Sequence, residues 1–333
     1  MLLKTYKSAR DLPEQWDNLA TGNPYMSRDF LAFIERTEHD YTPEYYLFFD
    51  GDAADSCFVA FVNTHFDIAM FTQRHIFKRV TMIYLPMSVT RPSLIPGRLR
   101  PQVLDTIKRI KGYTLVLNMP DENAEGFATG YTCPKCILKL RWKSFDDYCN
   151  SLRSDYRNRL KKVFRRSDML RIRFIDNKKE FDETYYRMYL NVLNNSATKI
   201  ETLSREYFCG EAFKIFAAEL EGRPVGFVQL LENGGELIFE FVGLDYDYNA
   251  KYQVYHRMLY EIVRYGISNG FESIDFGQTA DDTKLKLGCR YEYLYAWLRH
   301  SNAVINFLCK KFAPKLAYTP FTTNFRVFKE EDR

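Results

Sequence analysis

The chain lacks long hydrophobic runs and a marked excess of charge. None of its 333 residues falls in a run of eighteen apolar side chains, so no transmembrane helix is predicted. The first sixteen residues contain no continuous apolar stretch of the kind found in signal peptides. Lys and Arg number 47 against 43 Asp and Glu, an excess too small to indicate nucleic-acid binding by total charge alone. We therefore expect a cytoplasmic globular protein of two domains, at about 150 residues per domain.

Cysteine and histidine patterns also exclude several kinds of site. The seven cysteines are odd in number and scattered, so they form no disulfide framework and suit a reducing compartment. Cys133-Pro-Lys-Cys136 has the spacing of a zinc knuckle, but no second Cys or His pair follows at a suitable distance. The five histidines show no metal-ligand spacing, and no Ser-His-Asp order stands out. We expect no metal site and no nucleophilic hydrolase.

Hydrophobic periodicity predicts mixed helices and strands throughout the chain. In the first half, short aromatic and β-branched runs at 45–49, 57–63 and 80–85 indicate strands, and residues 99–111 indicate a helix that leads into a strand at 113–118. The second half is clearer. It begins with a basic helix (145–166), a short strand (172–175) and a helix (181–193), followed by three antiparallel strands (213–220, 225–231 and 237–242). A helix (252–268), a strand (273–276), a short helix (281–287) and a last strand (291–298) complete the order.

This element order and several motifs resemble the Fem-like branch of the GNAT N-acyltransferase superfamily. The motifs are Gly270-Phe-Glu-Ser-Ile-Asp-Phe-Gly277 after a helix, Lys284-Leu-Lys-Leu-Gly288, the basic helix around Tyr156–Lys161, and Asn23–Leu31 near the start. Together they cover most of residues 20–300. One departure is the pyrophosphate loop Q/R-x-x-G-x-G/A of acetyl-CoA-dependent GNAT enzymes, because the chain reads Asp-Tyr-Asp-Tyr-Asn-Ala-Lys at 245–251 instead.

The resemblance implies an α/β (α+β) fold of two tandem GNAT-like domains, each a mostly antiparallel mixed sheet flanked by helices. We place the domain boundary within residues 120–144, which gives an N-terminal domain at 1–135, an acyltransferase domain at 136–310 and a C-terminal tail at 311–333. The implied activity is N-acyl transfer from acyl-CoA, such as acetyl-CoA, to an amine that attacks directly. Two alternatives stay open: a Fem-type transferase that uses aminoacyl-tRNA, and a non-catalytic module that binds an anionic partner through the basic helix at 153–166.

Four residues are candidates for the chemistry of acyl transfer. The resemblance places a lysine near the reaction centre, and Lys284 at that position could neutralise a tetrahedral intermediate. Asp275 precedes it on a strand, and Glu240 is a carboxylate among apolar neighbours that could serve as a general base. Tyr291 could protonate the leaving group, since Tyr291, Tyr293 and Tyr295 alternate on the last predicted strand. The structural alternatives are a solvated side chain for Lys284 and Glu240, a solvated or turn-holding side chain for Asp275, and core packing for the tyrosine.

Two further groups of residues are candidates for binding. A predicted helix start at 249–253 offers free N–H groups to donor phosphates, with Asn249, Ala250, Lys251 and Tyr252 as the binding residues. Residues 141–176 hold eleven Lys or Arg and five Asp or Glu, and we assign Arg157, Arg159 and Lys161 of this basic helix to substrate binding. The expected acceptor is a small-molecule or peptide amine. A tRNA or the acidic headgroups of a membrane surface remain possible partners, and DNA is not expected; the alternative is a merely solvated helix face.

Overall fold

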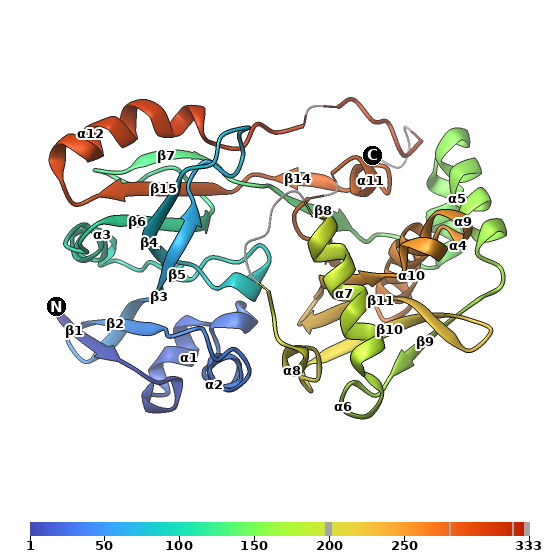
Figure 1. Ribbon diagram of the computed structural model, residues 1–333, viewed down its shortest axis with the longest axis horizontal. Helices are drawn as coiled ribbons and strands as arrows, with labels where there is room; N and C mark the ends of the chain where they lie inside the picture. The colour runs from blue at the N-terminus through green and yellow to red at the C-terminus, as the bar shows by residue number, and fades with distance from the viewer. Residues whose placement is uncertain (197–201, 280, 322, 330–333) are drawn as a thin grey trace. The chain divides into compact units, whose positions relative to one another are not determined.

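The computed structural model describes residues 1–196, 202–279, 281–321 and 323–329, and it divides the chain into two compact units. The first unit contains residues 1–134 and 293–320, and the second contains residues 135–292 and 321–333. Both are mixed α/β, with mostly antiparallel sheets flanked by helices (Figure 1), which confirms the predicted fold class. The first change of unit lies beside the expected boundary at 135/136. Residues 293–310, expected in the second domain, lie instead in the first unit.

The first unit is built on a sheet with the strand order β1-β2-β3-β4-β6-β15-β7, and β5 pairs with β3. All neighbours are antiparallel except β4 and β6. The strands are β1 (Leu2–Tyr6), β2 (Glu44–Asp50), β3 (Ala53–Asp67), β4 (Phe77–Ile83), β5 (Leu94–Ile95), β6 (Tyr113–Met119), β7 (Ala128–Tyr131) and β15 (Tyr295–His300). The helices are α1 (Gln15–Leu19), α2 (Arg28–Thr37), α3 (Arg100–Lys108) and α12 (Ala303–Phe312), with short 3-10 turns η1 (Ala9–Asp11), η2 (Pro24–Met26), η3 (Pro86–Ser88) and η4 (Ala313–Lys315).

The second unit repeats this arrangement with the strand order β9-β10-β11-β12-β13-β8-β14. Here β12 and β13 form the one parallel pair among the described strands. The strands are β8 (Lys135–Lys139), β9 (Leu170–Ile175), β10 (Phe213–Leu220), β11 (Arg223–Asn233), β12 (Glu236–Leu244), β13 (Ser273–Asp275) and β14 (Arg290–Glu292). The helices are α4 (Phe145–Ser151), α5 (Ser154–Arg166), α6 (Asn177–Glu180), α7 (Glu183–Asn195), α8 (Arg205–Phe208), α9 (Tyr246–Tyr252), α10 (Val254–Ser268) and α11 (Asp281–Leu285).

The last predicted strand, at 291–298, is in fact two strands that belong to different sheets. β14 pairs with β8 in the second unit, whereas β15 pairs with β6 and β7 in the first. The prediction that Tyr291, Tyr293 and Tyr295 line one strand face is therefore wrong. Alternating aromatic residues predict extended backbone, but they do not specify which sheet supplies the hydrogen-bonding partner.

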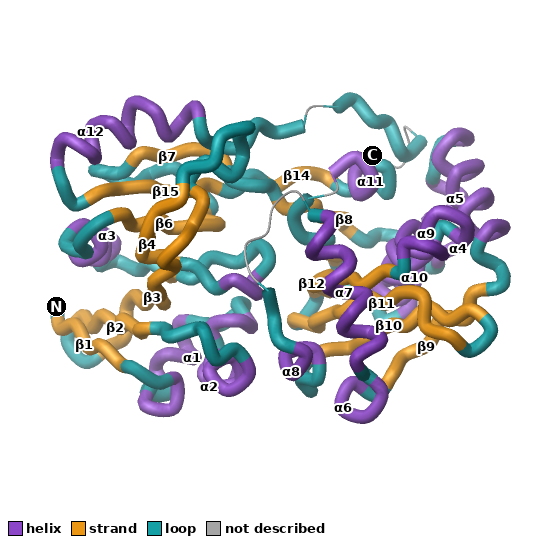
Figure 2. Tube along the Cα trace, viewed as in Figure 1, coloured by secondary structure: helices purple, strands orange, loops and turns teal. Residues whose placement is uncertain are grey.

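One predicted helix is divided, and another begins two residues later than predicted. The basic helix at 145–166 is broken between α4 and α5, because Leu152 and Arg153 have extended backbone, and Leu152 forms a β-bridge with Phe328. Ser144 caps α4 by accepting a hydrogen bond from the Asp147 N–H. The helix predicted from residue 252 is preceded by the separate helix α9, and Gln253 adopts a left-handed conformation (φ 54°) between α9 and α10. Figure 2 shows these helices as distinct segments.

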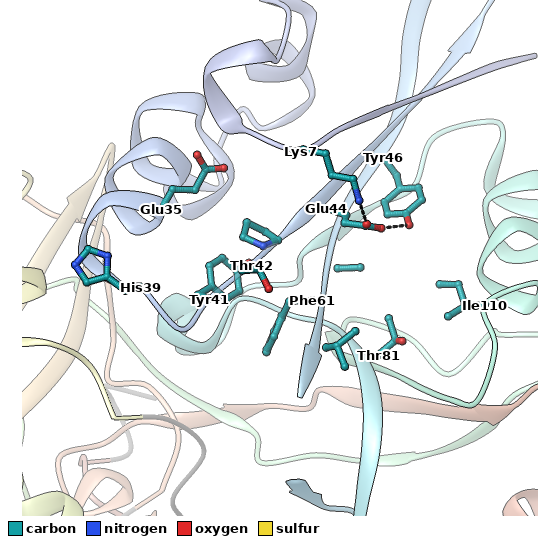
Figure 3. Close-up of a pocket in the computed structure, with 13 residues that line it drawn as sticks. Lys7, Glu35, His39, Tyr41, Thr42, Glu44, Tyr46, Phe61, Thr81 and Ile110 are labelled. Atoms are coloured by element: carbon teal, nitrogen blue, oxygen red, sulfur yellow. Dashed lines mark hydrogen bonds and ion pairs between the residues drawn. The ribbon is translucent and has the colours of Figure 1, made fainter. Parts of the chain in front are cut away.

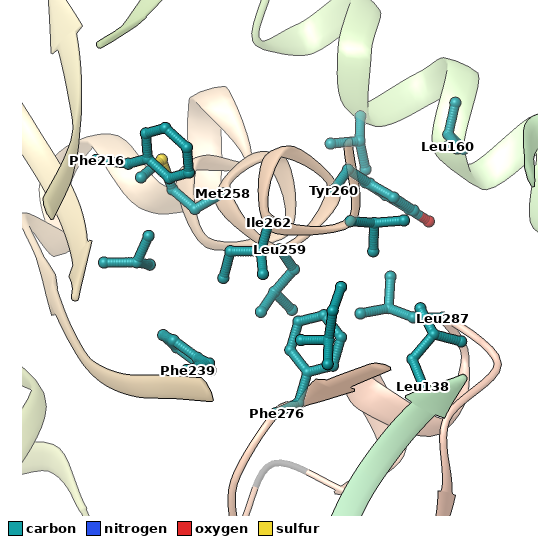
Figure 4. Packing of buried hydrophobic residues seen from close by; sticks show 14 of the residues in the cluster. Leu138, Leu160, Phe216, Phe239, Met258, Leu259, Tyr260, Ile262, Phe276 and Leu287 are labelled. Atoms are coloured by element: carbon teal, nitrogen blue, oxygen red, sulfur yellow. The ribbon is translucent and has the colours of Figure 1, made fainter. Parts of the chain in front are cut away.

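The core of the second unit forms around α10. Its buried side chains, among them Met258, Leu259 and Ile262, pack with Phe239 of β12 and Phe276 after β13 (Figure 4). The other face of the sheet is covered by α7 and α8, since Tyr189 and Phe208 contact the Phe241 ring with centroids 6.0 Å and 5.9 Å apart. Phe239 and Phe241 are two residues apart, so regular alternation would place them on the same face; a β-bulge between them, where the register with β11 shifts, turns them to opposite faces. This two-sided packing fixes where β12 lies.

Across the described residues, every helix is too short or too polar to cross a bilayer.

Candidate functional site

The parallel strands β12 and β13 pair over three residues only. Glu236, Leu237 and Ile238 are in register with Ser273, Ile274 and Asp275, and β13 ends there. β12 continues to Leu244 and pairs over that stretch with β11. No other described strand pairs with the β13-facing edge of residues 239–244. This open edge presents backbone N–H and C=O groups that a bound molecule can pair with.

A β-bulge lies in the same stretch of β12. The register with β11 runs from Leu230↔Phe239 to Val228↔Val242, so β12 carries one extra residue opposite Gln229. Glu240 sits in this bulge and is buried, with 7% of its surface exposed. A bulge changes the direction in which side chains point and interrupts strand pairing, and bulges are common beside active sites. The bulge therefore places a buried carboxylate two residues beyond the point where β12 and β13 part.

The first turn of α10 lies at the same end of the sheet as the open edge, because the carboxyl end of β12 leads through α9 into it. The Asn249 side chain accepts a hydrogen bond from the Tyr255 N–H at 2.9 Å, and Gln253 makes no side-chain cap. The predicted helix start at 249–253 is wrong in position, since these residues form α9 and the left-handed junction. Ala250 and Lys251 are exposed on α9, and the Lys251 Nζ lies 4.9 Å from the Tyr252 ring centroid. Asn249 thus acts as a cap for the following helix.

Cationic side chains gather around this first turn. Arg159 of α5 lies 3.1 Å from the His256 ring, measured from Nη2 to Nε2. Burial lowers the pKa of His256, and the charges of Arg159 and Lys286 lower it further. His256 in the first turn of α10, with Arg159 beside it, forms a favourable environment for an anion. Of the predicted substrate-binding residues, the structure brings Arg159 to this place. Arg157 is half-buried and Lys161 is exposed on α5.

Lys284 is buried beside the end of β13. Only 3% of its surface is exposed, and its Nζ donates a hydrogen bond to the Gln278 carbonyl at 2.6 Å. Burial lowers its pKa, and the nearby Cys136, Cys289, Asp275 and Asp281 partly oppose this. The Lys284 Nζ also lies 5.9 Å from the Phe239 ring centroid, which connects it to β12 where the strands part. The alternative of a solvated surface lysine is therefore excluded.

Asp275 and Tyr291 lie near Lys284. Asp275 is fully buried, and its Oδ1 accepts a hydrogen bond from the Gly277 N–H at 2.8 Å, which fixes the turn after β13. Tyr291 is half-buried on β14, in register with Cys136 of β8. The structure thus brings Asp275, Lys284 and Tyr291 to one side of the split between the strands, and it places Glu240 on the other strand.

Three residues at the site were not predicted from the sequence. His256 contacts Arg159 at the first turn of α10, and the charge of Lys286 acts on His256, although the Lys286 Nζ also pairs with Asp282 at 2.7 Å. Gln229 lies opposite the bulge. The Gln229 side chain is fully buried, and neither its amide nitrogen nor its amide oxygen has a hydrogen-bonding partner. A buried amide without partners is costly, so it is a candidate contact for a bound polar group. A glutamine in an apolar strand pattern was the available signal.

The first unit contains a separate pocket of about 630 Å³ (Figure 3). Lys7, Glu44 and Tyr46 lie on one side of it, and the Tyr46 hydroxyl donates to the Glu44 carboxylate at 2.7 Å. Lys7 pairs with the same carboxylate. These three polar groups already bind one another, and Glu35, His39, Thr42 and Thr81 are further polar residues among the aromatic and aliphatic ones that line the pocket. None of the residues predicted for catalysis or binding lies in it.

No candidate metal centre is formed in the part of the chain that the structure describes. All seven cysteines are free thiols.

Comparisons with known proteins agree with this geometry. The family model described as acetyltransferase (GNAT) domain matches residues 150–285, the region that contains the open strand edge, the bulge and α10. No curated protein sequence matches the chain.

Several solved structures share the fold over nearly the whole length of both chains. FemX matches with a TM-score of 0.54 and 8% identity, covering 93% of this chain and 100% of its own. The C-terminal domain of a putative lysylphosphatidylglycerol synthetase from Agrobacterium fabrum gives a TM-score of 0.54 and 9% identity, with 91% and 96% covered. A tandem GNAT protein from the clavulanic acid biosynthesis pathway gives 0.51 and 9%, with 90% and 99% covered.

These matches confirm the expected fold, since identities this low report on fold alone. The family match confirms the expected acyltransferase domain. Residues 150–285 match the acetyltransferase (GNAT) domain model, and the chain as a whole has a tandem GNAT-like fold.

Proposed function

We propose that this protein transfers an acyl group from acyl-CoA to an amine acceptor by direct attack. The observation that carries the proposal is the open edge of β12 beyond Ile238, which ends near the cationic first turn of α10. Carboxyl ends of parallel strands are the usual place for ligands in such sheets. We place the reaction in the cytoplasm.

The donor fits this arrangement in two parts. The pantetheine arm of coenzyme A contains two amide groups, and an extended arm can pair with the unpaired backbone groups of residues 239–244. The phosphates carry negative charge, which suits the first turn of α10 with Arg159, His256 and Lys286. Asn249 supports this site indirectly by capping the Tyr255 N–H. Ala250, Lys251 and Tyr252 then lie on α9 at the margin of the donor site.

The reaction needs a proton acceptor, a stabilised oxyanion and a proton donor. As the acceptor nitrogen attacks the thioester carbon, a C–N bond forms and the C–S bond breaks. Glu240 takes the proton from the amine, and the Tyr291 hydroxyl gives a proton to the leaving thiolate. Lys284 provides positive charge to the developing oxyanion, and Asp275 positions the turn that Lys284 holds through Gln278.

Aminoacyl-tRNA is the second candidate donor. The observation in its favour is the row of exposed cations on α5, Lys161, Lys162, Arg165 and Arg166, which suits a phosphate backbone. In a non-catalytic module the same cations would hold an anionic partner without turnover. Acyl-CoA remains the preferred donor, because these four cations are confined to a single short helix.

Calorimetric titration with acetyl-CoA and with a short RNA tests the proposal. We expect acetyl-CoA to bind, and the paired change Arg159→Gln with Lys286→Gln to weaken binding about tenfold or more. Arg165→Gln, on the solvent side of α5, is the matched control and keeps full affinity. Lys284→Met is expected to bind donor normally and to lose turnover. Binding of RNA but not acetyl-CoA would replace this proposal with one of the two alternatives.

A further inference from the structure

The helix α12 presents an unusual outer surface on the first unit. It follows β15 and lies along this strand and β7 (Figure 1). Its inner side is fixed by Asn306, whose Nδ2 donates to the Gly126 carbonyl at 3.1 Å, and by Cys309, whose pKa burial raises. None of its ten residues is fully buried. The face opposite Asn306 and Cys309 is therefore directed away from the sheet.

That outer face carries large apolar side chains. Val304 is 69% exposed, Phe307 64% and Leu308 44%, and the spacing of three and four residues places them on one stripe of the helix. Phe312 at the end of the helix is 47% exposed. Single exposed apolar residues are ordinary in soluble proteins, but a stripe of them on one helix marks an interaction surface.

Cationic residues accompany the stripe, and its own segment of the chain contains no anionic residue. Lys311 lies one turn after Phe307, within the stripe, and Lys310 and Lys315 lie beside it. Residues 293–320 contain four Lys or Arg and no Asp or Glu. Long lysine side chains can keep their ammonium groups in water at the headgroup level while the apolar stripe is buried in lipid. This combination is typical of helices that lie in the interface of an anionic membrane.

A small apolar hollow lies after the helix, between η4 and the sheet. It measures about 60 Å³ and is lined by Leu316 and Ala317 after α12 and by Phe66, Leu115 and Leu298 of the sheet. A second copy of the chain fits the outer face of α12 poorly, because a symmetric contact would bring the lysines of both copies together.

We propose that the α12 face, defined by Val304, Phe307, Leu308, Lys310 and Lys311, docks this protein on the surface of an anionic lipid bilayer. The helix lies in the plane of the interface and does not cross the membrane. The proposal is independent of the donor and acceptor of acyl transfer, since vesicle binding is measured without either.

Flotation of the full-length protein with vesicles tests it. We expect binding to phosphatidylcholine vesicles that contain about one third phosphatidylglycerol, and weak binding to pure phosphatidylcholine. The double change Phe307→Asp with Leu308→Asp should lower the partition coefficient at least about tenfold. Phe77→Asp is the matched control, because Phe77 is 47% exposed on β4 of the same unit and should leave partitioning unchanged.

The charges are tested separately. Lys310→Ala with Lys311→Ala should reduce binding to anionic vesicles about tenfold and leave binding to neutral vesicles unchanged. Lys161→Ala with Lys162→Ala removes the same charge from α5 and should have little effect. If the aspartate variant fails to fold, Phe307→Trp provides a second readout, with a blue shift of its emission expected on anionic vesicles.

Three results would overturn the proposal. The first is no binding of the unaltered protein to anionic vesicles. The second is an equal loss from the α5 lysine pair, which would show general electrostatic attraction without a docking face. The third is a dimer in light scattering that Phe307→Asp with Leu308→Asp converts to a monomer, which would assign the face to a second copy.

Discussion

The two sheets share the chain order of their first five strands, from β1 to β6 and from β9 to β13, but differ at the parallel pair in the middle of each sheet. In the first unit, residues 80–83 of β4 pair with 113–116 of β6, and β4 ends with the pairing. The loop that follows is tied to β6, because the Asn118 Nδ2 donates to the Val89 and Arg91 carbonyls at 3.3 Å and 3.4 Å. In the second unit, β12 continues for six residues beyond its partner. Only the second sheet presents this open edge.

The helix after each of these strands shows the same contrast. At the start of α3, the Asp55 carboxylate accepts hydrogen bonds from the Arg98 and Leu99 N–H groups, both at 2.9 Å. The anion-binding position is thus filled by the protein's own side chain. At the start of α10, cations gather instead, and no carboxylate caps the helix through Gln253. Under the proposed function, the second unit binds the donor and the first supports the structure.

The largest expected effect tests which unit is catalytic. Glu240→Gln removes the proposed proton acceptor at the bulge while keeping its size, so kcat/KM should fall about 100-fold or more, with donor affinity unchanged. Glu44→Gln, which alters a carboxylate of the pocket in the first unit, should leave kcat/KM within about twofold. Steady-state kinetics of both variants decide the point. The opposite pattern would move the active site to the first unit.

The second test makes α10 resemble α3. His256→Asp places a carboxylate at the first turn, where it would occupy the N-terminus and repel the donor phosphates. We expect acetyl-CoA affinity to fall about tenfold or more by calorimetry. His256→Asn, which adds no charge, should retain most of the affinity. Equal affinity of the aspartate variant and the unaltered protein would mean that the phosphates bind elsewhere.

The converse change in the first unit should affect stability. Asp55→Ala removes the side chain that caps α3, and we expect the free energy of unfolding to fall by about 1–2 kcal/mol. Denaturation followed by tryptophan fluorescence is suitable, because Trp16 and Trp297, both fully buried, belong to this unit. Acetyl-CoA affinity of the folded variant should not change. A loss of affinity would contradict the structural role assigned to α3.

The smallest expected effect concerns pH. The folded state lowers the pKa of His256 below 6.5, so its contribution to stability is present above pH 6.5 and is lost as the pH falls through the lowered value. A bound phosphate would raise this pKa again, so donor binding takes up protons. We expect acetyl-CoA affinity to rise about threefold from pH 7.5 to 6, relative to His256→Asn. Identical pH dependence of the two proteins would remove His256 from the donor site.

Local sequence patterns predicted most elements but not their limits. The hairpin strands β10, β11 and β12 were predicted within two residues of their ends, because turn residues at 221–224 and 233–235 separate apolar runs. The break at Leu152 was missed, since both sides of it are good helix sequence and the bridge to Phe328 spans 176 positions. Likewise, the division of α9 from α10 depends on a left-handed Gln253, a conformation that glutamine seldom adopts.

The sequence by itself determined the order of the strands β9 to β13 in the second unit, but not β8, and with the family resemblance it pointed to Lys284, Asp275 and Arg159 as candidate site residues. Spacing along the chain and apolar periodicity are local properties, and they suffice for this. Only the tertiary structure decided that β14 and β15 enter different sheets and that His256 lies beside Arg159. It also decided that the Asp55 carboxylate caps the N-terminus of α3, whereas cationic side chains surround the N-terminus of α10. These outcomes depend on contacts between segments far apart in the sequence. The free energy of such contacts comes from side-chain packing and burial, which cannot be inferred from neighbouring residues alone.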